Sequence, residues 1–456
     1  MAKKKKPSFV CSACGHTVAR WQGKCPACNE WNTFEEAVIS GNDRPGTKSL
    51  SQVKKVKPVL ITDVDMSGGE VRLKTGIHEL DRVLGGGLVT GSLSLIGGDP
   101  GVGKSTLLLM ALSQFAGKGL KTLYVSGEES ARQIRLRAER LEINTAGLHL
   151  LAETDLDAAL AAAELLKPRV VVLDSVQTLY SLSIDSVPGS MSQVREVANR
   201  SMQFSKRSGI PTFLVGHVTK QGSIAGPKVL EHLVDTVIYF EGEGASQLRA
   251  LRAVKNRFGS TGELGFFEMT ERGLEEVPDA SARLLSERVQ GAAGTTVLAA
   301  MEGSRTVLAE VQALVGQPTP ATPSRTVLGM DRARLQMLLA VLAKMGYKLY
   351  DRDVFLSAAG GLRILEPAGD LAIAAAIASS VRDEAIHHRT LLFGEIGLVG
   401  EIRAVSHPAQ RMLEAQRHGF TRVIGPHSIV QHAPEGLEAV GARTLRQALG
   451  QLFLGG

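Results

Sequence analysis

Apolar positions between about residue 60 and residue 278 fall into short continuous runs that alternate with longer stretches of helical periodicity. A strand buried on both faces of a sheet is apolar at nearly every position, and a helix returns the chain to the next parallel strand. The pattern therefore predicts an α/β domain built on a parallel sheet. Its expected strands are residues 92–96, 122–125, 170–173, 212–215 and 234–240.

A second pattern of strands and helices begins near residue 280. Residues 295–301 and 306–315 are typical of strands, residues 331–345 of an amphipathic helix, and residues 371–381 of an Ala-rich apolar helix. Several prolines within residues 317–324 predict a loop. This second pattern predicts a separate C-terminal domain.

Composition divides the 456 residues into four parts. Residues 1–35 hold all the cysteines and tryptophans, and residues 36–60 have the Ser, Gly, Pro and Lys content of a linker. The two patterned regions, residues 61–278 and 279–456, are each long enough to bury a core of their own.

The overall balance of residues is that of a globular protein, with 44% hydrophobic and 21% charged positions. A formal net charge of +6 favours polyanionic partners. Part of this charge lies in the run from Lys3 to Lys6, which is either a solvated tail or an arm that contacts phosphates. Aromatic residues make up only 4%, so base stacking is not expected to be the main mode of nucleic-acid binding.

The sequence predicts no membrane partner. No stretch approaches the roughly 18 consecutive apolar residues of a spanning helix, and the basic N-terminus is followed by cysteines rather than by the apolar core of a signal peptide. We therefore expect a cytoplasmic location. In that reducing compartment, clustered cysteines indicate a metal site rather than disulfides.

The cysteines form two C-x-x-C pairs, Cys11 with Cys14 and Cys25 with Cys28. Each pair can place two thiolates on one knuckle, and four sulfurs complete a closed tetrahedral shell for Zn2+. A closed shell predicts a structural zinc, whose binding supplies folding energy to so short a module. A redox dithiol is the alternative. The role of the module stays open between docking to DNA, to a partner protein and to the neighbouring domain.

Residues 98–105 match the pattern G-x-x-x-x-G-K-S, a phosphate-binding loop. The motif lies between an expected strand and an expected helix, so main-chain N–H groups and a helix N-terminus can hold the phosphates of ATP. Lys104 is expected to neutralise phosphate charge, and Ser105 to bind Mg2+. The predicted nucleotide contacts are Gly98, Asp99, Pro100, Gly101, Val102, Gly103, Lys104, Ser105 and Thr106.

Three carboxylates follow expected strands of the same domain. Asp174 ends the apolar run that begins at residue 170, and after a phosphate loop this position predicts a second contact to Mg2+, although such aspartates also cap helices. Glu128 and Glu129 follow residues 122–125, at the strand end where such sheets bind ligands. We expect catalysis from them, with Glu128 preferred over Glu129 as the group that activates water. The alternative is that they charge the first turn of the next helix.

Lys255 and Arg257 belong to the pentad K-N-R-F-G at residues 255–259, which follows a strand-like stretch. The pentad is either a basic surface turn or a pair of cations that reach the γ-phosphate held by a neighbouring subunit. The sequence pattern leaves both interpretations open.

Taken together, these motifs make the whole chain resemble the RadA (Sms) family of bacterial DNA repair proteins. The resemblance is carried by residues 9–31, 97–106, 173–175 and 255–259 and by the C-terminal domain. It implies a RecA-like ATPase core in a homo-hexameric ring. It also implies ATP-driven branch migration on single-stranded DNA in branched recombination intermediates, with a RecA-type recombinase as a partner.

The same resemblance gives roles to two basic segments. It implies that Lys255 and Arg257 act between subunits and contact DNA. The loop from His217 to Lys228, which also carries Lys220, matches the region that lines the central channel of RecA-like rings. The alternative is that this loop is a mobile, solvated connection.

Residues from about 280 to 456 resemble the proteolytic domain of Lon, an α+β fold that uses a serine nucleophile and a lysine base. Aligning residues 366–369 with the serine-bearing loop places Pro367 at the nucleophile, and aligning the strand that starts at residue 394 places Ala409 at the lysine. Neither side chain can do that chemistry, and nearby Ser357 has no evident matching lysine. We therefore expect a scaffold for ring assembly and a candidate surface for DNA.

Three functions remain to be separated. The first is a motor that couples ATP hydrolysis to DNA movement. The second is an ATP-dependent protease, against which the missing dyad argues. The third is a RecA-like signalling ATPase of the clock-protein kind, which needs no DNA. Stimulation of ATP hydrolysis by DNA separates the first from the third, and degradation of casein identifies the second.

Overall fold

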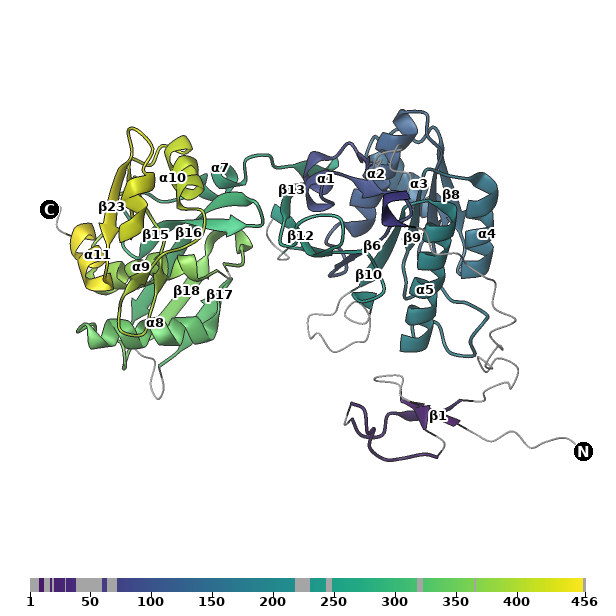
Figure 1. The fold of residues 1–456 in the computed structure, drawn as a ribbon, viewed down its shortest axis with the longest axis horizontal. Helices are drawn as coiled ribbons and strands as arrows, with labels where there is room; N and C mark the ends of the chain where they lie inside the picture. The colour runs from purple at the N-terminus through teal and green to yellow at the C-terminus, as the bar shows by residue number, and fades with distance from the viewer. Residues whose placement is uncertain are drawn as a thin grey trace, which may run out of the picture. The chain divides into compact units, whose positions relative to one another are not determined.

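The computed structural model describes residues 8–11, 17–18, 20–28, 30–37, 60–63, 72–217, 230–242, 248–317, 323–364 and 366–453. The chain divides into two compact units, shown in Figure 1. The first comprises Met1–Glu241, Leu251–Gly265 and Met269–Glu275, and the second comprises Gly242–Ala250, Phe266–Glu268 and Glu276–Gly456.

A nine-stranded sheet forms the core of the first unit, in the order β14-β13-β12-β11-β6-β10-β9-β7-β8. From β11 to β8 every pairing of neighbours is parallel, so the carboxyl ends of these strands lie at the same end of the sheet. The bounds are β6 Leu93–Gly98, β7 Thr122–Ser126, β8 Leu148–Ala152, β9 Val170–Asp174, β10 Thr212–His217, β11 Thr236–Glu241, β12 Leu248–Asn256, β13 Leu264–Thr270 and β14 Gly273–Glu276.

The expected α/β core is confirmed, because the expected runs form β6, β7, β9, β10 and β11 of this sheet. Every residue of β6, β7 and β9 is buried, which explains why their sequences are continuous apolar runs. The pattern of apolar runs did not reveal β8. That strand lies at the edge of the sheet and is partly exposed, and His149 interrupts its apolar run.

Helices connect these strands, and three of them begin after a residue whose side chain caps the first turn: Ser130, Asp155 and Ser190. The side chain of Ser130 accepts a hydrogen bond from the Gln133 N–H, and the Gln133 side chain accepts one from the Ser130 N–H, which together form a capping box. Gly209 directly follows helix α5 (Met191–Ser208) and has a left-handed φ of 72°. A glycine in this conformation commonly ends a helix. The bounds are α1 His78–Val83, α2 Lys104–Gly117, α3 Ala131–Arg140, α4 Leu156–Leu166 and α5 Met191–Ser208.

The second unit is built on a seven-stranded mixed sheet in the order β17-β18-β16-β15-β19-β22-β23. The two strands expected from residue 295 form an antiparallel hairpin of β15 (Thr295–Glu302) and β16 (Arg305–Gly316). The two expected helices are α8 (Arg332–Lys344) and α9 (Asp370–Arg382). Buried α9 packs against β15 and β16. Residues 318–322 of the expected loop lie outside the described residues.

The strand bounds of this unit are β15 Thr295–Glu302, β16 Arg305–Gly316, β17 Arg325–Leu328, β18 Asp353–Ala358, β19 Thr390–Leu392, β22 Arg422–Pro426 and β23 Glu438–Ala442, and a short hairpin pairs β20 Glu395–Ile396 with β21 Ile402–Arg403. The helices are α7 Ala280–Leu285, α8 Arg332–Lys344, α9 Asp370–Arg382, α10 Pro408–Arg417 and α11 Leu445–Leu452.

An ion pair with one fully buried partner holds the segment that the sequence aligns with the Lon dyad. Pro367 begins a 3-10 turn and Ala409 lies in α10. Next to these two positions in the sequence, both terminal nitrogens of the fully buried Arg411 contact the Glu366 carboxylate, each at 2.7 Å. Glu366 also accepts a hydrogen bond of 2.6 Å from the main-chain N–H of Met301. Buried charges need such pairing to be tolerated, so this position serves to hold α10, the turn and β15 together.

A three-stranded antiparallel sheet in the N-terminal segment pairs β1 (Ser8–Cys11) with β2 (Thr17–Val18) and β3 (Phe34–Ala37). Across the described parts of the chain, every helix is too short or too polar to cross a lipid bilayer.

Candidate functional site

The phosphate-binding motif forms the turn between β6 and α2, at the carboxyl end of the sheet. Space requires a glycine at position 98, and backbone conformation requires one at position 103. Gly98 has a φ of 153°, and a Cβ there would lie 2.4 Å from the main-chain oxygen of Phe240. Gly103 has a left-handed φ of 113° and caps α2 without a side chain. The turn thus leaves main-chain N–H groups and a helix N-terminus available to an anion.

Lys104, the first residue of α2, is almost fully buried beneath this turn. Its Nζ donates to the carbonyl oxygens of Gly98 at 2.8 Å and Asp99 at 2.9 Å. Burial lowers the pKa of Lys104, whereas the negative charges of Asp174, Glu128 and Asp99 act to raise it. An ammonium that is withdrawn from water and held by main-chain oxygens is well placed to meet a phosphate group.

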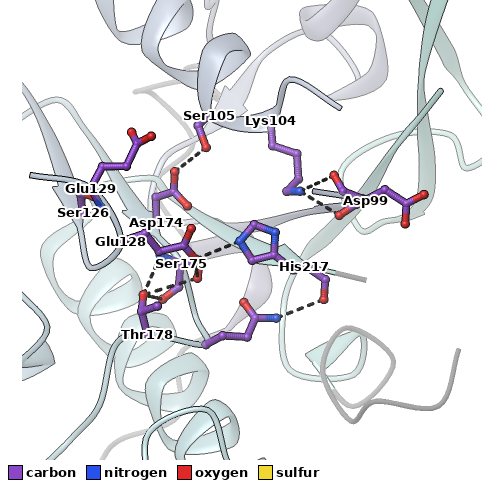
Figure 2. A network of polar contacts seen from close by, with 12 residues as sticks. Asp99, Lys104, Ser105, Ser126, Glu128, Glu129, Asp174, Ser175, Thr178 and His217 are labelled. Carbon is purple, nitrogen blue, oxygen red and sulfur yellow. Dashed lines mark hydrogen bonds and ion pairs between the residues drawn. The ribbon is translucent and has the colours of Figure 1, made fainter. Parts of the chain in front are cut away.

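Asp174 ends β9 and faces α2 across the site, as Figure 2 shows. Its Oδ2 accepts hydrogen bonds from the Ser105 hydroxyl at 2.6 Å and from the Tyr124 hydroxyl. Its Oδ1 is buried and has no hydrogen-bond partner among the described residues. A buried carboxylate oxygen without a partner, beside a hydroxyl, is the oxygen donor set that Mg2+ prefers. Asp174 and Ser105 therefore fit the predicted magnesium site.

Tyr124 is a member of this site that the sequence did not reveal. It lies in the middle of β7 and is buried, so its pattern is that of a core residue. Burial, followed by the negative charge of Asp174, raises the pKa of the Tyr124 hydroxyl well above its usual range. The phenol therefore stays protonated and donates to one oxygen of Asp174, which leaves the other oxygen free for a metal ion or its water.

We expect Tyr124→Phe to raise the Mg2+ concentration that half-saturates ATP hydrolysis, since the phenylalanine no longer orients Asp174. The loss of one hydrogen bond to a charged group, about 1.5–3 kcal/mol, corresponds to roughly a tenfold shift or more. The measurement is ATPase rate against Mg2+ concentration. A wild-type midpoint with a reduced plateau would show that Tyr124 contributes only to packing.

Glu128 and Glu129 point in different directions, as Figure 2 shows. The carboxylate of Glu128 accepts a hydrogen bond from the Ser175 hydroxyl and lies 2.9 Å from Nε2 of His217. Glu129 instead forms an ion pair with Arg137 of α3. Glu128 thus lies beside Asp174 and His217, whereas Glu129 is held toward α3.

The surroundings of Glu128 keep it ionised. The hydrogen bond from His217 is the largest cause that lowers the pKa of Glu128, and burial opposes it; Ser175 and the charges of His217 and Lys104 lower the pKa further. Side-chain atoms of Glu128, Asp174 and His217 lie within 4.8 Å of one another. An ionised carboxylate beside a phosphate site can accept a proton from water.

The sequence singles out His217 only as the first residue of the loop that matches the channel-lining region. The structure shows it as the last residue of β10, in register with Gly98 of the phosphate-binding turn. A polar residue at the carboxyl end of a central parallel strand is the signal that identifies it. The loop that follows, including Lys220 and Lys228, lies outside the described residues.

Lys255 and Arg257 lie apart from the phosphate-binding turn and are held by a different segment. Lys255 Nζ donates to the main-chain oxygens of Glu231 at 2.5 Å and Val234 at 2.9 Å. Arg257 lies 3.1 Å from Asp235, and half of its side chain is exposed. Neither contact involves the residues that surround Lys104. This placement leaves an intermolecular role open to the pair.

The zinc motif brings its described cysteines together. The sulfurs of Cys11 and Cys28 are 3.7 Å apart, and those of Cys11, Cys25 and Cys28 all lie within 4.8 Å of one another. Sulfurs bound to one zinc at about 2.3 Å in a tetrahedron are separated by roughly 3.8 Å, so these residues fit a zinc ion. Cys14 lies outside the described residues.

Cys28→Ser is expected to lower zinc content and to unfold the N-terminal module, because a hydroxyl is a poor replacement for a thiolate ligand and the module has little apolar core. Zinc released per chain, measured with a chromogenic chelator, reports the first effect. Protease cleavage restricted to the N-terminal segment reports the second. Wild-type zinc content in this variant would contradict a thiolate site that includes Cys28.

The fold and the site together define a P-loop ATPase that carries a zinc ribbon. Family models match the chain in agreement with this class: an AAA domain over residues 57–223, a rubredoxin metal binding domain over residues 9–36, and the ChlI subunit of Mg-chelatase over residues 330–429. A KaiC-like protein from Pyrococcus horikoshii OT3 superposes with a TM-score of 0.39 at 19% identity, covering 46% of this chain and 99% of the other.

Full-length relatives give the family. The DNA repair protein RadA of Bacillus subtilis (strain 168) is 48% identical and that of Pseudomonas aeruginosa 47% identical, each match covering 99% of this chain and 100% of the relative. RadA of Listeria monocytogenes is 47% identical over 98% of this chain and 99% of the relative. The chain belongs to the RadA family of DNA repair proteins. It is an AAA-type ATPase with a zinc ribbon and a C-terminal domain of the ChlI and Lon kind.

Proposed function

We propose that this chain is an ATP-driven motor that moves single-stranded DNA within branched recombination intermediates, as a cytoplasmic homo-hexamer that works with a RecA-type recombinase. The observation that carries the proposal is the convergence of Lys104, Glu128 and Asp174 at one end of the sheet, in a chain whose relatives are DNA repair proteins. A site of this kind releases the energy of ATP hydrolysis, and the family indicates the substrate on which that energy acts.

The chain's own residues divide the chemistry between them. Lys104 holds and neutralises the terminal phosphates, and the turn of residues 98–103 supplies main-chain donors. The ionised carboxylate of Glu128 takes a proton from the attacking water while Ser175 and His217 keep it oriented. Asp174 and Ser105 would hold Mg2+, which would supply positive charge to the phosphate oxygens.

The link from hydrolysis to movement is proposed to run through His217. This residue contacts Glu128 and is followed directly by the basic loop predicted to line a channel. If the contacts of Glu128 change during hydrolysis, its contact with His217 changes too. The position of His217 at the end of β10, where the loop begins, is then altered. Lys255 and Arg257 are proposed to act on the nucleotide of a neighbouring subunit, since Arg257 is exposed and apart from its own phosphate-binding turn.

A branch-migration assay with ATP tests the proposal. We expect the wild type to move branches, and Lys104→Ala and Arg257→Ala to fail. Arg135→Ala is the matched control, because Arg135 is an exposed arginine on α3.

The logarithm of strand affinity is expected to fall linearly with the logarithm of salt concentration, with a slope of about −0.7 for each neutralised phosphate. Failure of DNA to stimulate ATP hydrolysis would favour a signalling ATPase.

Proteolysis is the weaker alternative. Pro367 and Ala409 supply neither nucleophile nor base, and the neighbouring Glu366 is engaged in an ion pair with the buried Arg411. Incubation with casein and ATP is expected to give no cleavage. Cleavage that survived removal of contaminating proteases would reverse this conclusion.

A further inference from the structure

Both tryptophans of the chain lie on the surface of the zinc ribbon. Trp21 is 54% exposed and Trp31 is 67% exposed, and the sequence contains no others. An indole presents a large apolar face that is costly to leave in water, and such rings are typical of binding surfaces. The packing of this small module does not explain why it exposes two such rings.

The two rings flank a single glycine. A Cβ placed on Gly23 would lie 3.8 Å from the Trp21 ring and 3.7 Å from the Trp31 ring, so both indoles reach the same point of the main chain. The main chain beneath them is fixed: the N–H of Asn32 donates to the oxygen of Gly23 at 2.8 Å, and that of Cys25 donates to the oxygen of Glu30 at 2.8 Å. The zinc-binding knuckle thus presents the rings as a preformed surface.

Cations accompany the rings. Lys24 Nζ lies 5.7 Å from the centre of the Trp31 ring, and Arg20 precedes Trp21 and is exposed. Exposed rings with cations beside them match a nucleic-acid strand, whose bases stack while its phosphates need positive charge. One exposed acid, Glu30, adjoins Trp31 in sequence, and its charge opposes such a strand.

We propose that Trp21 and Trp31 form a stacking platform for unpaired bases of a single strand, with Lys24 and Arg20 at the flanking phosphates. The inference deepens the proposed function and rests on it for the identity of the ligand. It gives the zinc ribbon a direct role in holding the strand. Duplex DNA offers no free base faces along its length, so the platform selects unpaired segments.

Because the platform contains every tryptophan of the chain, tryptophan fluorescence reports on it directly. Full-length, zinc-loaded protein is titrated with a short oligo(dT) and, separately, with an abasic strand of equal length and charge. We expect the base-bearing strand to quench the emission and the abasic strand to leave it nearly unchanged. Equal quenching by both strands, or no quenching while fluorescence anisotropy of a labelled strand shows binding, overturns the proposal.

Variants supply a second test. Trp21→Ala and Trp31→Ala are each expected to weaken oligo(dT) binding about tenfold, and Trp31→Phe by less because phenylalanine still stacks. Glu30→Gln is expected to strengthen binding. Tyr350→Ala, which removes an exposed aromatic side chain of the second unit, is the matched control. Zinc content shows that each variant keeps its ribbon folded.

The outcome separates the platform from the motor. If the platform is wrong, oligo(dT) still stimulates ATP hydrolysis while the tryptophan emission stays constant and both alanine variants bind the strand as the wild type does. If the motor is wrong, ATP hydrolysis is unstimulated whatever the tryptophans report. Wild-type strand affinity in both alanine variants, together with loss of a protein partner in a pull-down, would assign the surface to that protein and overturn the proposal.

Discussion

Lys104→Ala is expected to abolish ATP hydrolysis and to leave the fold intact. The Lys104 ammonium lies among the charges of Asp174, Glu128 and Asp99, so alanine removes both the contact to phosphate and the positive charge that offsets these acids. A phosphate would then enter a site of unbalanced negative charge. Removing one such group from an active site costs about 10^2–10^3 in rate, and we expect at least that loss.

The fold survives because alanine is the best helix former and sits at the first position of α2. Phosphate release, with and without single-stranded DNA, measures the rate, and thermal unfolding checks the fold. Lys118→Ala is the matched control, since Lys118 is exposed at the other end of the same helix. Turnover near the wild-type rate in Lys104→Ala would remove the phosphate-binding role from residues 98–105.

The parts of the site that could be predicted from the sequence are those set by neighbouring residues. The glycines, Lys104 and Ser105 belong to one turn between a strand and a helix, and their order alone defines the geometry. Asp174 could be predicted because it directly follows a run in which every residue is buried. The core strands were predictable for the same reason, since burial on both faces leaves a continuous apolar pattern.

The parts that could not be predicted depend on contacts between distant segments. Tyr124 meets Asp174 across 50 positions, and His217 meets Glu128 across 89. Tyr124 has the pattern of an ordinary core residue, and the strand-end position of His217 marks it as a candidate without indicating its partner. These pairs form only because strands far apart in sequence belong to one parallel sheet, in which β9 lies between β7 and β10. A local pattern carries no record of that strand order.

A local sequence pattern also cannot decide between the adjacent residues Glu128 and Glu129. Adjacent identical residues cannot be ranked by their own pattern. Their partners separate them. Arg137 of α3 forms an ion pair with Glu129, whereas Ser175 and His217 contact Glu128 in the site. The preference for Glu128 therefore rests on partners that the fold supplies.

Glu128→Gln is expected to stop hydrolysis while ATP binding persists. The amide has the same shape and its oxygen can still accept hydrogen bonds from Ser175 and His217, so the local structure is retained. It cannot take a proton from water, and loss of a general base costs about 10^2–10^4 in rate. A single-turnover assay of phosphate release, beside binding of a fluorescent ATP analogue, separates the two properties.

Glu129→Gln is the matched control, and the contrast between the two variants decides the assignment. It removes the same charge one residue away and breaks only a partly exposed ion pair with Arg137, a contact of small energetic value. We therefore expect nearly wild-type hydrolysis from Glu129→Gln and almost none from Glu128→Gln. If Glu129→Gln hydrolysed ATP more slowly than Glu128→Gln, nucleotide binding would have to move the Glu129 side chain into the site. Equal, severe losses would mean that the loop acts as a unit, because a defect confined to one chemical group cannot appear at both positions.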